Sequence, residues 1–485
     1  MRPVDHTGET VPVTADQTFD VIVIGAGSTG ENVADVVVKG GLTAVLVESE
    51  LVGGECSYWA CMPSKALLRG TEVLEEARAV GGAAAAVTGE QDVAATLARR
   101  NSFTSNWDDS GQVTWVDGAG IALVRGAGRV DGEKRVVVTA ADGSTSTLTA
   151  RHAVVVCTGS EAAVPPLEGI DDVEVWTARE ATSAQQVPGR LVILGGGVVG
   201  VEMATAWSAL GSQVTLLQRG DRLLAGQEPE AGDAVAASLR DRGVDVQLNT
   251  SVTTVRKDGD GVVVVTGTGE VRGDQFLVAA GRRARTGDIG LDTVGLAPGE
   301  YLDVDDTLRV RGVDWLYGVG DANGRRLLTH MGKYQARQAA AAIVARATGE
   351  QVSMADWSPF VATADAAATP QVTFSIPQVA SVGITAAQAE EQGIAHTVVR
   401  YELGNVAGSA LFADGYAGKA VAVVDTDRQV LVGLTFVGPG VSEMLQAATI
   451  AVVGEVPISR LWHAVPAYPT MNEVWLRLLE TLRDQ

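Results

Sequence analysis

The chain has 485 residues, which at roughly 100 to 200 residues per domain is enough for several domains and excludes a single small binding module. Hydrophobic residues make up 46% and charged residues 20%, with 57 glycines, which excludes intrinsic disorder and favours an α/β protein rich in glycine turns. The formal net charge of −22 would repel phosphate backbones and anionic lipid, so we expect neither nucleic acid nor a membrane surface as a partner.

The N-terminus and the cysteine content indicate the compartment. Residues 1–20 lack the basic start and apolar core of a signal peptide, so we expect a mobile, uncleaved arm. No uninterrupted run of about 18 apolar residues occurs, so we expect a soluble protein. The three cysteines are too few for a secreted disulfide framework. The predicted location is therefore the reducing cytoplasm.

The first motif is a strand, a glycine turn and a helix at residues 20–30 (DVIVIGAGSTG). The next apolar run, residues 43–49, completes a βαβ unit and ends in Glu48, at the spacing of a ribose-binding acid. Three glycines permit the tight turn, the close approach of a pyrophosphate and close helix packing: Gly25, Gly27 and Gly30. We predict that this unit binds FAD or NAD, with a purely structural turn as the alternative.

Cys56 and Cys61 follow directly, in GGECSYWACMPSK at the predicted start of a helix. A helix N-terminus lowers a thiol pKa, so this pair is predicted to form a reversible disulfide and a reactive thiolate. The alternatives are two inert cysteines or a structural metal site, but no other Cys/His cluster completes a tetrahedral set, so no metal is predicted. The intervening Tyr58 and Trp59 either shape an acceptor surface or pack the helix. Cys157 is interpreted as a core residue.

The strand-turn-helix pattern recurs at residues 190–220. Its three glycines repeat the first motif: Gly195, Gly197 and Gly200. The second strand, however, ends in Gln218 and Arg219, where an NAD site would usually present a carboxylate. An arginine there can hold a 2′-phosphate, which favours NADPH over NADH, with Arg222 as a helper. The alternative is a solvated turn arginine.

The rest of the chain supplies the closing elements of these units and a third domain. Each unit ends in an apolar strand and a glycine, Gly159 in the first and Gly281 in the second. A long Ala/Gln/Arg helix is predicted over residues 328–347. From about residue 360 the sequence pattern changes and predicts paired strands, which we assign to a third domain. The last residues predict an amphipathic helix after two prolines.

These motifs, in this order, resemble the FAD-dependent pyridine nucleotide-disulfide oxidoreductases, the family of lipoamide dehydrogenase, glutathione reductase and mercuric reductase. The resemblance spans nearly the whole chain and rests on VIVIGAGSTG, GGECSYWACMPSKALL, VVVCTGS, LVILGGGVVGVEMA, LVAAGRRART, LYGVGDANG, FSIPQVASVGIT and YPTMNE. It implies two Rossmann-like dinucleotide-binding domains and a C-terminal α+β dimerisation domain in a homodimer. The implied segments are an FAD-binding domain in two parts (1–165 and 284–359), an NAD(P)H-binding domain (166–283) and a dimer-interface domain (360–485).

The resemblance also implies roles for individual residues. FAD would bind the first glycine unit, Glu48 and Gly159, with Asp321 on the ribityl chain, while the second unit and Gly281 would hold the nicotinamide nucleotide. Cys56 would be the interchange thiol and Cys61 the flavin-side thiol. Lys65 and Glu202 match family positions that form an ion pair beside the reactive nitrogen of the flavin.

The C-terminal motif departs from the family. Disulfide exchangers carry a histidine, supplied by the partner subunit, where this chain has Tyr468, while Pro469, Thr470 and Glu473 keep their positions. A tyrosine with a pKa of about 10 can donate a proton at neutral pH but hardly accept one, so lipoamide-type oxidation is disfavoured and reduction of an acceptor is favoured. Mercuric reductases have a similar tyrosine, but this chain ends without their paired cysteines, so mercury reduction is not supported.

The sequence therefore predicts an FAD-dependent NAD(P)H:disulfide oxidoreductase of the EC 1.8.1 type, which serves cell redox homeostasis. Electrons would pass from NADPH through FAD to the Cys56-Cys61 disulfide and then to a small-molecule disulfide or related acceptor. The alternatives are an NAD(P)H:quinone or dye reductase acting directly from the flavin, a mercuric reductase-like activity, or a non-catalytic component of a multienzyme complex.

Overall fold

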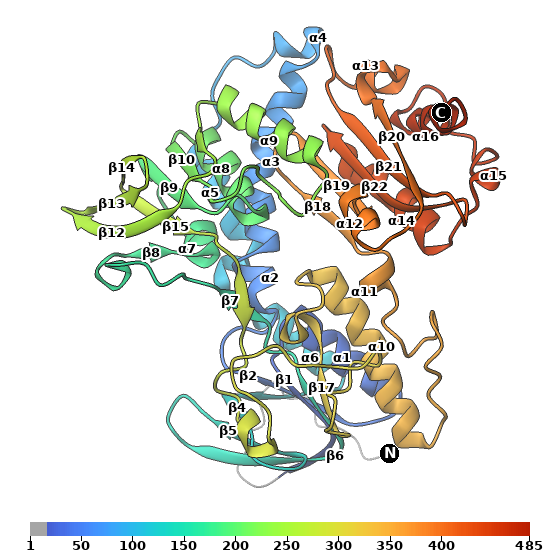
Figure 1. The fold of residues 1–485 in the computed structure, drawn as a ribbon. Helices are drawn as coiled ribbons and strands as arrows, with labels where there is room; N and C mark the ends of the chain where they lie inside the picture. The colour runs from blue at the N-terminus through green and yellow to red at the C-terminus, as the bar shows by residue number, and fades with distance from the viewer. Residues whose placement is uncertain (1–16) are drawn as a thin grey trace. The chain divides into compact units, whose positions relative to one another are not determined.

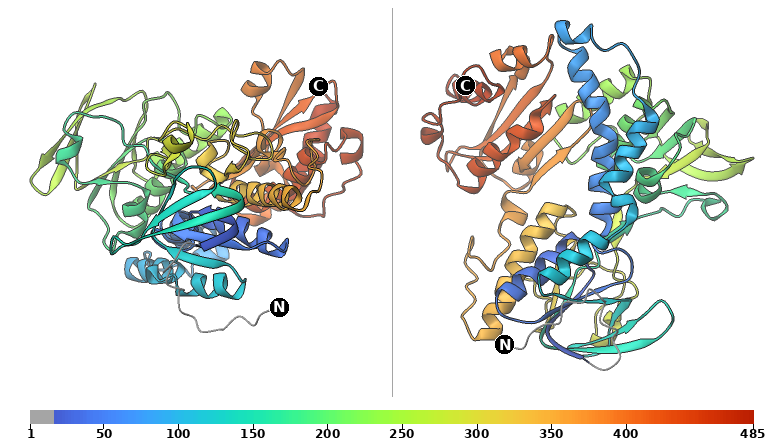
Figure 2. Two further views of the ribbon diagram at one scale, coloured as in Figure 1. Left: turned by 90° about the horizontal axis from the view of Figure 1, so that it is seen from below. Right: turned by 180° about the vertical axis from the view of Figure 1, so that it is seen from behind.

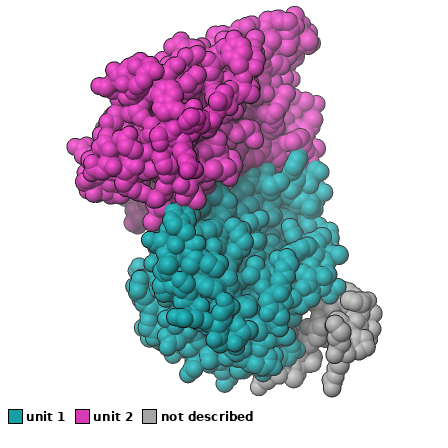
Figure 3. Space-filling model, turned by 90° about the vertical axis from the view of Figure 1, so that its right-hand side faces the viewer, with its two compact units in different colours: residues 1–62, 101–161, 282–365 teal, residues 63–100, 162–281, 366–485 magenta. Residues whose placement is uncertain are grey.

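The computed structural model describes residues 17–485, and this part of the chain forms two compact units (Figure 3). The first unit holds residues 17–62, 101–161 and 282–365, and the second holds residues 63–100, 162–281 and 366–485. Most of the predicted N-terminal arm, residues 1–16, lies outside the described residues. Residues 17–20 already belong to the first strand, so the strand begins earlier than predicted.

The first unit is built on a seven-stranded sheet of order β3-β2-β1-β6-β5-β4, in which β17 also pairs with β6 (Figure 1). The β4-β5 and β5-β6 pairs are antiparallel and the other pairs are parallel. Val21, Ile22 and Val23 of β1 are fully buried, as in a parallel sheet covered on both faces. The strands are β1 (Gln17–Ile24), β2 (Ala44–Glu48), β3 (Ala122–Arg125), β4 (Ala127–Val130), β5 (Arg135–Thr139), β6 (Thr145–Val156) and β17 (Leu316–Gly318).

The long helix α10 packs beside α1 in this unit (Figure 1). A Cβ at Gly332 of α10 would overlap the Thr29 hydroxyl of α1, so the glycine allows the two helices to approach closely. The helices and 3₁₀ turns of the unit are α1 (Ser28–Lys39), α2 (Gly54–Tyr58), η1 (Ser105–Trp107), α6 (Ser110–Gly118), η3 (Leu291–Val294), η4 (Gly320–Asn323) and α10 (Thr329–Thr348). Strand β16 (Arg282–Ala284) also belongs to it, and four elements contain a unit boundary: α3 (Cys61–Arg78), α5 (Val93–Phe103), β7 (Ser160–Ala162) and α11 (Ala364–Ala367).

The second unit begins with a parallel sheet of order β11-β10-β9-β15-β8 and an antiparallel sheet of order β12-β13-β14. The strands are β8 (Val175–Trp176), β9 (Arg190–Leu194), β10 (Gln213–Leu217), β11 (Asp245–Gln247), β12 (Val252–Asp258), β13 (Gly261–Thr266), β14 (Gly269–Gly273) and β15 (Gln275–Val278). The helices are α4 (Gly81–Ala84), η2 (Ile170–Asp172), α7 (Ala178–Ser183), α8 (Val198–Ala209) and α9 (Pro229–Asp241). Trp207 of α8 is fully buried in the core of this part.

The C-terminal part of the second unit is an antiparallel sheet of order β18-β19-β22-β21-β20 with helices packed on it (Figure 2). The strands are β18 (Pro370–Thr373), β19 (Gln378–Gly383), β20 (His396–Glu402), β21 (Lys419–Asp425) and β22 (Val430–Gly438). The helices are α12 (Ala386–Glu391), η5 (Leu403–Asn405), α13 (Ala407–Phe412), η6 (Val441–Met444), α14 (Leu445–Val453), α15 (Ile458–Leu461), η7 (Met471–Glu473) and α16 (Val474–Arg483). The predicted amphipathic helix at the C-terminus is therefore confirmed.

The predicted fold class, two dinucleotide-binding α/β sheets and a C-terminal α+β part, is confirmed. The four predicted domain boundaries stay a prediction. Among residues 17–485, no helix combines the length and apolar character that crossing a bilayer requires.

Candidate active site

The first glycine turn, between β1 and α1, has the geometry of a phosphate cradle. Gly25 has a φ of +100°, and a Cβ there would overlap the Cys157 carbonyl, so only glycine fits. A Cβ at Gly30 would overlap the Gly25 carbonyl in the same way. The Glu48 carboxylate accepts a hydrogen bond from the Ala26 amide at 2.7 Å, which holds this acid against the turn. The turn, the helix N-terminus and the acid thus come together as predicted.

The second glycine turn, in the other unit, repeats this arrangement. Gly195 has a φ of +114°, and a Cβ at Gly200 would overlap its carbonyl. The Gln218 side-chain oxygen accepts from the Gly196 amide at 3.0 Å, the same contact that Glu48 makes in the first turn. Gln218 therefore takes the place of the acid without its charge. The neighbouring Arg219 is exposed.

The remaining predicted nucleotide-binding glycines lie where a ligand has room. Within residues 17–485, and apart from the chain neighbours of each glycine, no atom lies within 4 Å of a Cβ built at Gly159, Gly197 or Gly281. At Gly27 the nearest such atom is the Cα of Gly54, at 3.8 Å. Gly159 and Gly281 also have positive φ angles, of +75° and +137°. Both turns therefore keep open space beside the backbone amides that would face phosphate groups.

The two cysteines of the motif lie on two helices, not on the single helix that was predicted. Cys56 is in the short helix α2, and Cys61 is the first residue of α3, because the chain leaves helical geometry at Trp59, which has a φ of −138°. Neither sulfur is in a disulfide, and both thiols are half-buried. The Cys61 sulfur lies 3.2 Å from the Thr329 hydroxyl at the start of α10.

The predicted lowering of the thiol pKa is wrong for Cys56. Its pKa is raised, first by a hydrogen bond with Cys61 and then by burial, while the positive charge of Lys333 acts in the opposite direction. A thiol that shares its proton with a neighbouring sulfur does not ionise readily, and the helix terminus does not offset this.

Two interpretations as packing residues are consistent with the structure. Cys157 is buried, and burial raises the pKa of its thiol. Tyr58 is also buried, and its hydroxyl donates to the Val52 carbonyl at 3.0 Å. The Trp107 indole donates to the Tyr58 carbonyl at 3.2 Å, which places Tyr58 in the interior of the first unit. Tyr58 packs the helix and forms no exposed acceptor surface.

The predicted ion pair between Lys65 and Glu202 is present in the second unit, with an Nζ–Oε2 distance of 2.7 Å. The Glu202 side chain is only 4% exposed, and its other oxygen accepts from the Phe374 amide at 2.9 Å. The Lys65 ammonium also lies 4.9 Å from the centre of the Phe374 ring. Each oxygen of this buried carboxylate therefore has a partner, Lys65 for one and the Phe374 amide for the other.

Asp321 lies in a polar cluster that the sequence analysis missed. Its carboxylate accepts from the Ser160 hydroxyl at 2.5 Å, and that hydroxyl accepts from the Arg282 guanidinium at 2.6 Å. Arg282 and Arg285 both contact Glu55, the residue before Cys56, at 2.6 and 3.2 Å. Burial raises the pKa of Asp321, and Ser160 and Arg282 counteract this. In the sequence, the only sign of the contact between Glu55 and these arginines is that Glu55 is a charged residue directly before Cys56.

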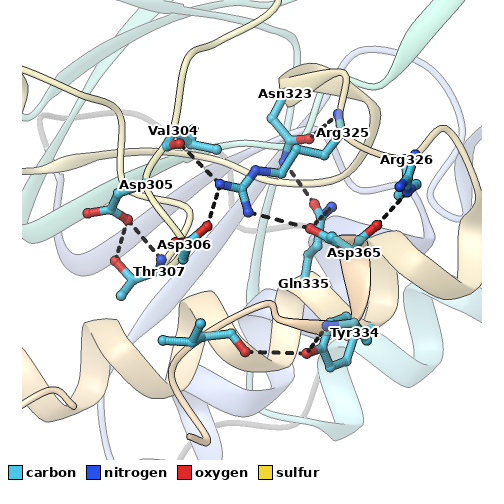
Figure 4. A network of polar contacts seen from close by, with 12 residues as sticks. Val304, Asp305, Asp306, Thr307, Asn323, Arg325, Arg326, Tyr334, Gln335 and Asp365 are labelled. Carbon is cyan, nitrogen blue, oxygen red and sulfur yellow. Dashed lines mark hydrogen bonds and ion pairs between the residues drawn. The ribbon is translucent and has the colours of Figure 1, made fainter. Parts of the chain in front are cut away.

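A network of polar contacts around Gln335 includes Asn323 and Arg325, which closely follow Asp321 in the chain (Figure 4). The fully buried Gln335 of α10 accepts from the Gly320 amide and from the Asn323 side chain, both at 2.8 Å. Its own amide donates to Asp365 at 2.9 Å. Arg325 lies 3.7 Å from the same carboxylate. One side chain therefore joins the Asp321 loop, helix α10 and Asp365.

Replacing Gln335 with leucine should lower the free energy of unfolding by about 2–4 kcal/mol, because two buried donors and a carboxylate lose their partner. The thermal unfolding midpoint measures this loss, and the flavin content after purification measures the effect on the Asp321 loop. Gln338→Leu, on the same helix, is the matched control because the Gln338 side-chain oxygen has no partner among the described residues. Equal midpoints for the two variants would contradict the supporting role of Gln335.

Tyr468 and Glu473 both belong to the second unit, and their environments differ. Tyr468 is 76% exposed, whereas Glu473 is buried and pairs with Arg477 of α16. The peptide bond between Tyr468 and Pro469 is cis. In residues 17–485, no three His, Cys, Asp or Glu side chains are grouped as a metal site would require.

Comparison with known proteins agrees with this geometry. The family model "Pyridine nucleotide-disulphide oxidoreductase" matches residues 19–349, and the model of the dimerisation domain of that family matches residues 369–478. A mercuric reductase from Streptomyces lividans is 30% identical over 94% of this chain and 94% of its own length. A dihydrolipoyl dehydrogenase from Chlamydia trachomatis is 29% identical over 95% of this chain and 96% of its own length.

Solved structures share the fold. The HOCl-induced flavoprotein disulfide reductase RclA from Escherichia coli, solved as a Cu(II) complex, superposes with a TM-score of 0.82 at 23% identity, covering 96% of this chain and 99% of that chain. LpdA from Mycobacterium tuberculosis superposes with a TM-score of 0.81 at 24% identity, with the same coverage.

Proposed function

Since this chain belongs to the pyridine nucleotide-disulphide oxidoreductases, flavoenzymes that bind FAD and a pyridine nucleotide, we propose that it carries electrons from NADPH to a small-molecule disulfide. The observation that carries the proposal is the dithiol centre in the first unit. Cys56 and Cys61 share a proton there, and the Cys61 sulfur is fixed at 3.2 Å from Thr329. Two cysteines in this arrangement are suited to cycle between dithiol and disulfide.

The residues of the first unit fit FAD. Gly25 and Gly30 permit the tight turn and Gly27 leaves room at the N-terminus of α1, while Glu48 is the proposed acid for a ribose and Asp321 the proposed acid for the ribityl chain. Gly159 keeps open space in the same unit. When bound, FAD supplies the two-electron chemistry that connects the nicotinamide to the disulfide. Lys65 and Glu202 are the proposed charge pair that tunes this transfer.

The chemistry of the cysteines is thiol-disulfide exchange. The Cys56 thiolate attacks one sulfur of the acceptor disulfide, so that a mixed disulfide forms and the first thiolate leaves. The Cys61 thiolate then attacks Cys56, which restores the Cys56-Cys61 disulfide and releases the second thiolate. Each leaving thiolate takes up one proton, so the acceptor gains two electrons and two protons.

NADPH is the proposed electron donor because of the end of β10. Gln218 makes the contact of the ribose-binding acid but carries no negative charge, so it does not repel a 2′-phosphate. Arg219 beside it is exposed and available for a charge-assisted hydrogen bond to that phosphate. A neutral amide and a guanidinium together favour the extra dianion. Gly195, Gly197, Gly200 and Gly281 would line the rest of the nucleotide site.

Replacing Arg219 with glutamine should lower kcat/KM for NADPH by about tenfold or more, because one charge-assisted hydrogen bond to the phosphate is lost. The value for NADH should change by less than about twofold, since NADH has no such phosphate. Steady-state kinetics with both nucleotides measure the difference. Arg256→Gln is the matched control, because Arg256 pairs with Glu270 in the separate sheet of β12 to β14. A wild-type preference for NADH would contradict the assignment.

We propose a homodimer in which Tyr468 and Glu473 complete the site of the partner subunit. The dimerisation domain at residues 369–478 supports this, and so does the exposure of Tyr468, because an aromatic side chain 76% exposed in one chain is available to a second. Tyr468 would act as a proton donor. The use of free thiols and NADPH is the basis for a proposed cytoplasmic location.

The second candidate function is direct reduction of a quinone or dye from the flavin, and the raised pKa of Cys56 together with the missing histidine favours it. An anaerobic titration with NADPH discriminates the two. A long-wavelength charge-transfer band between a thiolate and oxidised flavin supports the disulfide route. Bleaching of the flavin without this band supports the direct route.

A further inference from the structure

Helix α2, which carries Cys56, is too short to be stable by itself. It has five residues, whereas isolated helices shorter than about 12–15 residues are marginal in water. Contacts within the first unit fix its two ends. The Gly53 amide, at the N-terminal end, donates to the Ala26 carbonyl at 2.8 Å. The carbonyl of the last residue, Tyr58, accepts from the Trp107 indole at 3.2 Å. Cys56 lies midway between these two anchors.

The Glu55 side chain supplies a third anchor, in the middle of the helix. Its Oε2 accepts from Arg282 at 2.6 Å, and its Oε1 accepts from Arg285 at 3.2 Å. Both arginines lie in or directly after strand β16, 227 and 230 residues further along the chain. A carboxylate with a guanidinium on each oxygen cannot turn about its last bond without losing a hydrogen bond. We call these three residues, Glu55, Arg282 and Arg285, the Glu55 clamp.

The clamp has a firm base, because Arg282 is also held from its other side. Its Nε donates to the Ser160 hydroxyl at 2.6 Å, and its Nη2 donates to the Ser160 carbonyl at 2.7 Å. The Ser160 hydroxyl in turn donates to Asp321 at 2.5 Å. The side chains of Glu55 and Arg282 are only 21% and 24% exposed, so water screens this pair less than a surface ion pair. The position of Glu55 therefore follows from that of Arg282.

The two cysteines need separate anchors, because they do not share a helix. The chain leaves helical geometry at Trp59, between α2 and α3, so neither helix alone fixes the separation of the two sulfurs. The Cys61 sulfur lies 3.2 Å from the Thr329 hydroxyl of α10, which anchors it. On the side of Cys56, the nearest anchored side chain in the sequence is Glu55, its direct neighbour. The relative placement of the thiols thus depends on both anchors.

We propose that Glu55 is a positioning residue for Cys56, and that the Glu55 clamp holds this thiol where it closes the disulfide with Cys61. The inference rests on the proposed function and deepens it. In the closing step the bond between Cys56 and the acceptor sulfur breaks, the Cys56-Cys61 bond forms, and the acceptor leaves as a thiolate that takes up a proton. Two groups held in a suitable orientation react as if at high concentration, and freedom of one of them lowers this effective concentration.

The test measures how favourably the Cys56-Cys61 disulfide closes in the holoenzyme. The protein is equilibrated without oxygen in mixtures of reduced and oxidised dithiothreitol, quenched with acid and alkylated. Trypsin releases both cysteines in one peptide, residues 40–65, because no lysine or arginine separates them from Lys65. Mass spectrometry then gives the ratio of the disulfide form to the doubly alkylated form, and hence the equilibrium constant for closing.

Glu55→Gln should lower this constant by about tenfold, because an amide keeps one acceptor oxygen and has no charge, so that one arginine is released. Arg285→Gln should lower it by about threefold, since the contact with Arg282 remains. The double variant should fall little further than Glu55→Gln alone, because both changes break the same contact.

Glu161→Gln is the matched control. Glu161 pairs with Arg283 at 2.7 Å and lies 3.8 Å from Arg285, so this variant removes the same charge from the same cluster. Glu161 has no cysteine beside it in the chain, so the closing constant should stay within about twofold of the wild type. An equal fall in Glu161→Gln and Glu55→Gln would show that the charge of the cluster acts, and would overturn the positioning role.

A closing constant of Glu55→Gln that coincides with the wild type also overturns the inference, whether or not the thermal unfolding midpoint falls. If Glu55→Gln does not fold, Arg285→Gln decides, and an unchanged constant in that half-exposed variant overturns it. Failure of the proposed function has a different signature, because Cys56→Ser would then leave acceptor turnover intact whatever the closing constants are.

Discussion

Replacing Cys56 with serine should lower turnover with a disulfide acceptor by at least about three orders of magnitude, because Cys56 is the thiol proposed to form the mixed disulfide. Reduction of the flavin by NADPH should stay within about twofold of the wild type, since that step precedes the exchange. Stopped-flow absorbance measures flavin reduction, and release of free thiols from an aromatic disulfide measures turnover. The combination would place Cys56 after the flavin in the electron path.

Cys157→Ala is the matched control for this experiment. Cys157 is a buried free cysteine of the same unit, whose thiol pKa is raised by burial, so its loss should not affect acceptor turnover. If turnover were unchanged in Cys56→Ser, electrons would leave directly from the flavin, and the quinone or dye reductase activity would be the better assignment.

Replacing Lys65 with methionine should lower the free energy of unfolding by about 2–3 kcal/mol, because the buried Glu202 carboxylate would keep only the Phe374 amide as a partner. This loss is smaller than for a fully buried pair, since the Lys65 side chain is 34% exposed. The urea concentration at half-unfolding measures the change. Flavin reduction should also slow if the pair tunes hydride acceptance as proposed.

The double variant Lys65→Met/Glu202→Gln distinguishes charge from packing. A glutamine keeps the acceptor for the Phe374 amide and carries no charge that needs a cation, so the double variant should regain most of the lost stability. The single variant Glu202→Gln completes the double-mutant cycle, which gives the interaction free energy between Lys65 and Glu202. A double variant no more stable than Lys65→Met would show that the contact of Lys65 with the Phe374 ring matters more than the ion pair.

The features that the sequence predicted well are those with local steric causes. Gly25 and Gly195 adopt positive φ angles, and a Cβ at Gly30 or Gly200 would overlap the carbonyl of the glycine five residues before it, so the spacing of each motif itself carries this constraint. The position of Gln218 opposite the second turn follows from the same spacing. The substitution of Tyr468 for a histidine could also be read from the chain, because the residues around it keep their order.

The features that the sequence did not predict depend on contacts between distant segments. Glu55 meets Arg282 and Arg285 although more than 220 residues separate them, and no local pattern encodes that meeting. In the sequence, Gln335 is one of several polar residues in an alanine-rich helix, and nothing there predicts its contacts with Gly320 and Asp365. Cys56 is a different case: a helix terminus predicts easy ionisation, but the hydrogen bond with the nearby Cys61 and the burial of the thiol raise its pKa.

The interleaving of the two units has a consequence for synthesis on the ribosome. Strand β17 pairs with Val154, Val155 and Val156 of β6, but it is translated about 160 residues after them. At about 5–20 residues per second this is a delay of roughly 10–30 s, during which that edge of a highly apolar strand has no partner. Helix α16, which belongs to the second unit, is translated after all described residues of the first unit. Neither unit can therefore be expressed as one contiguous fragment, and nascent chains of this protein should depend on chaperones that shield the open edge until β17 has been made.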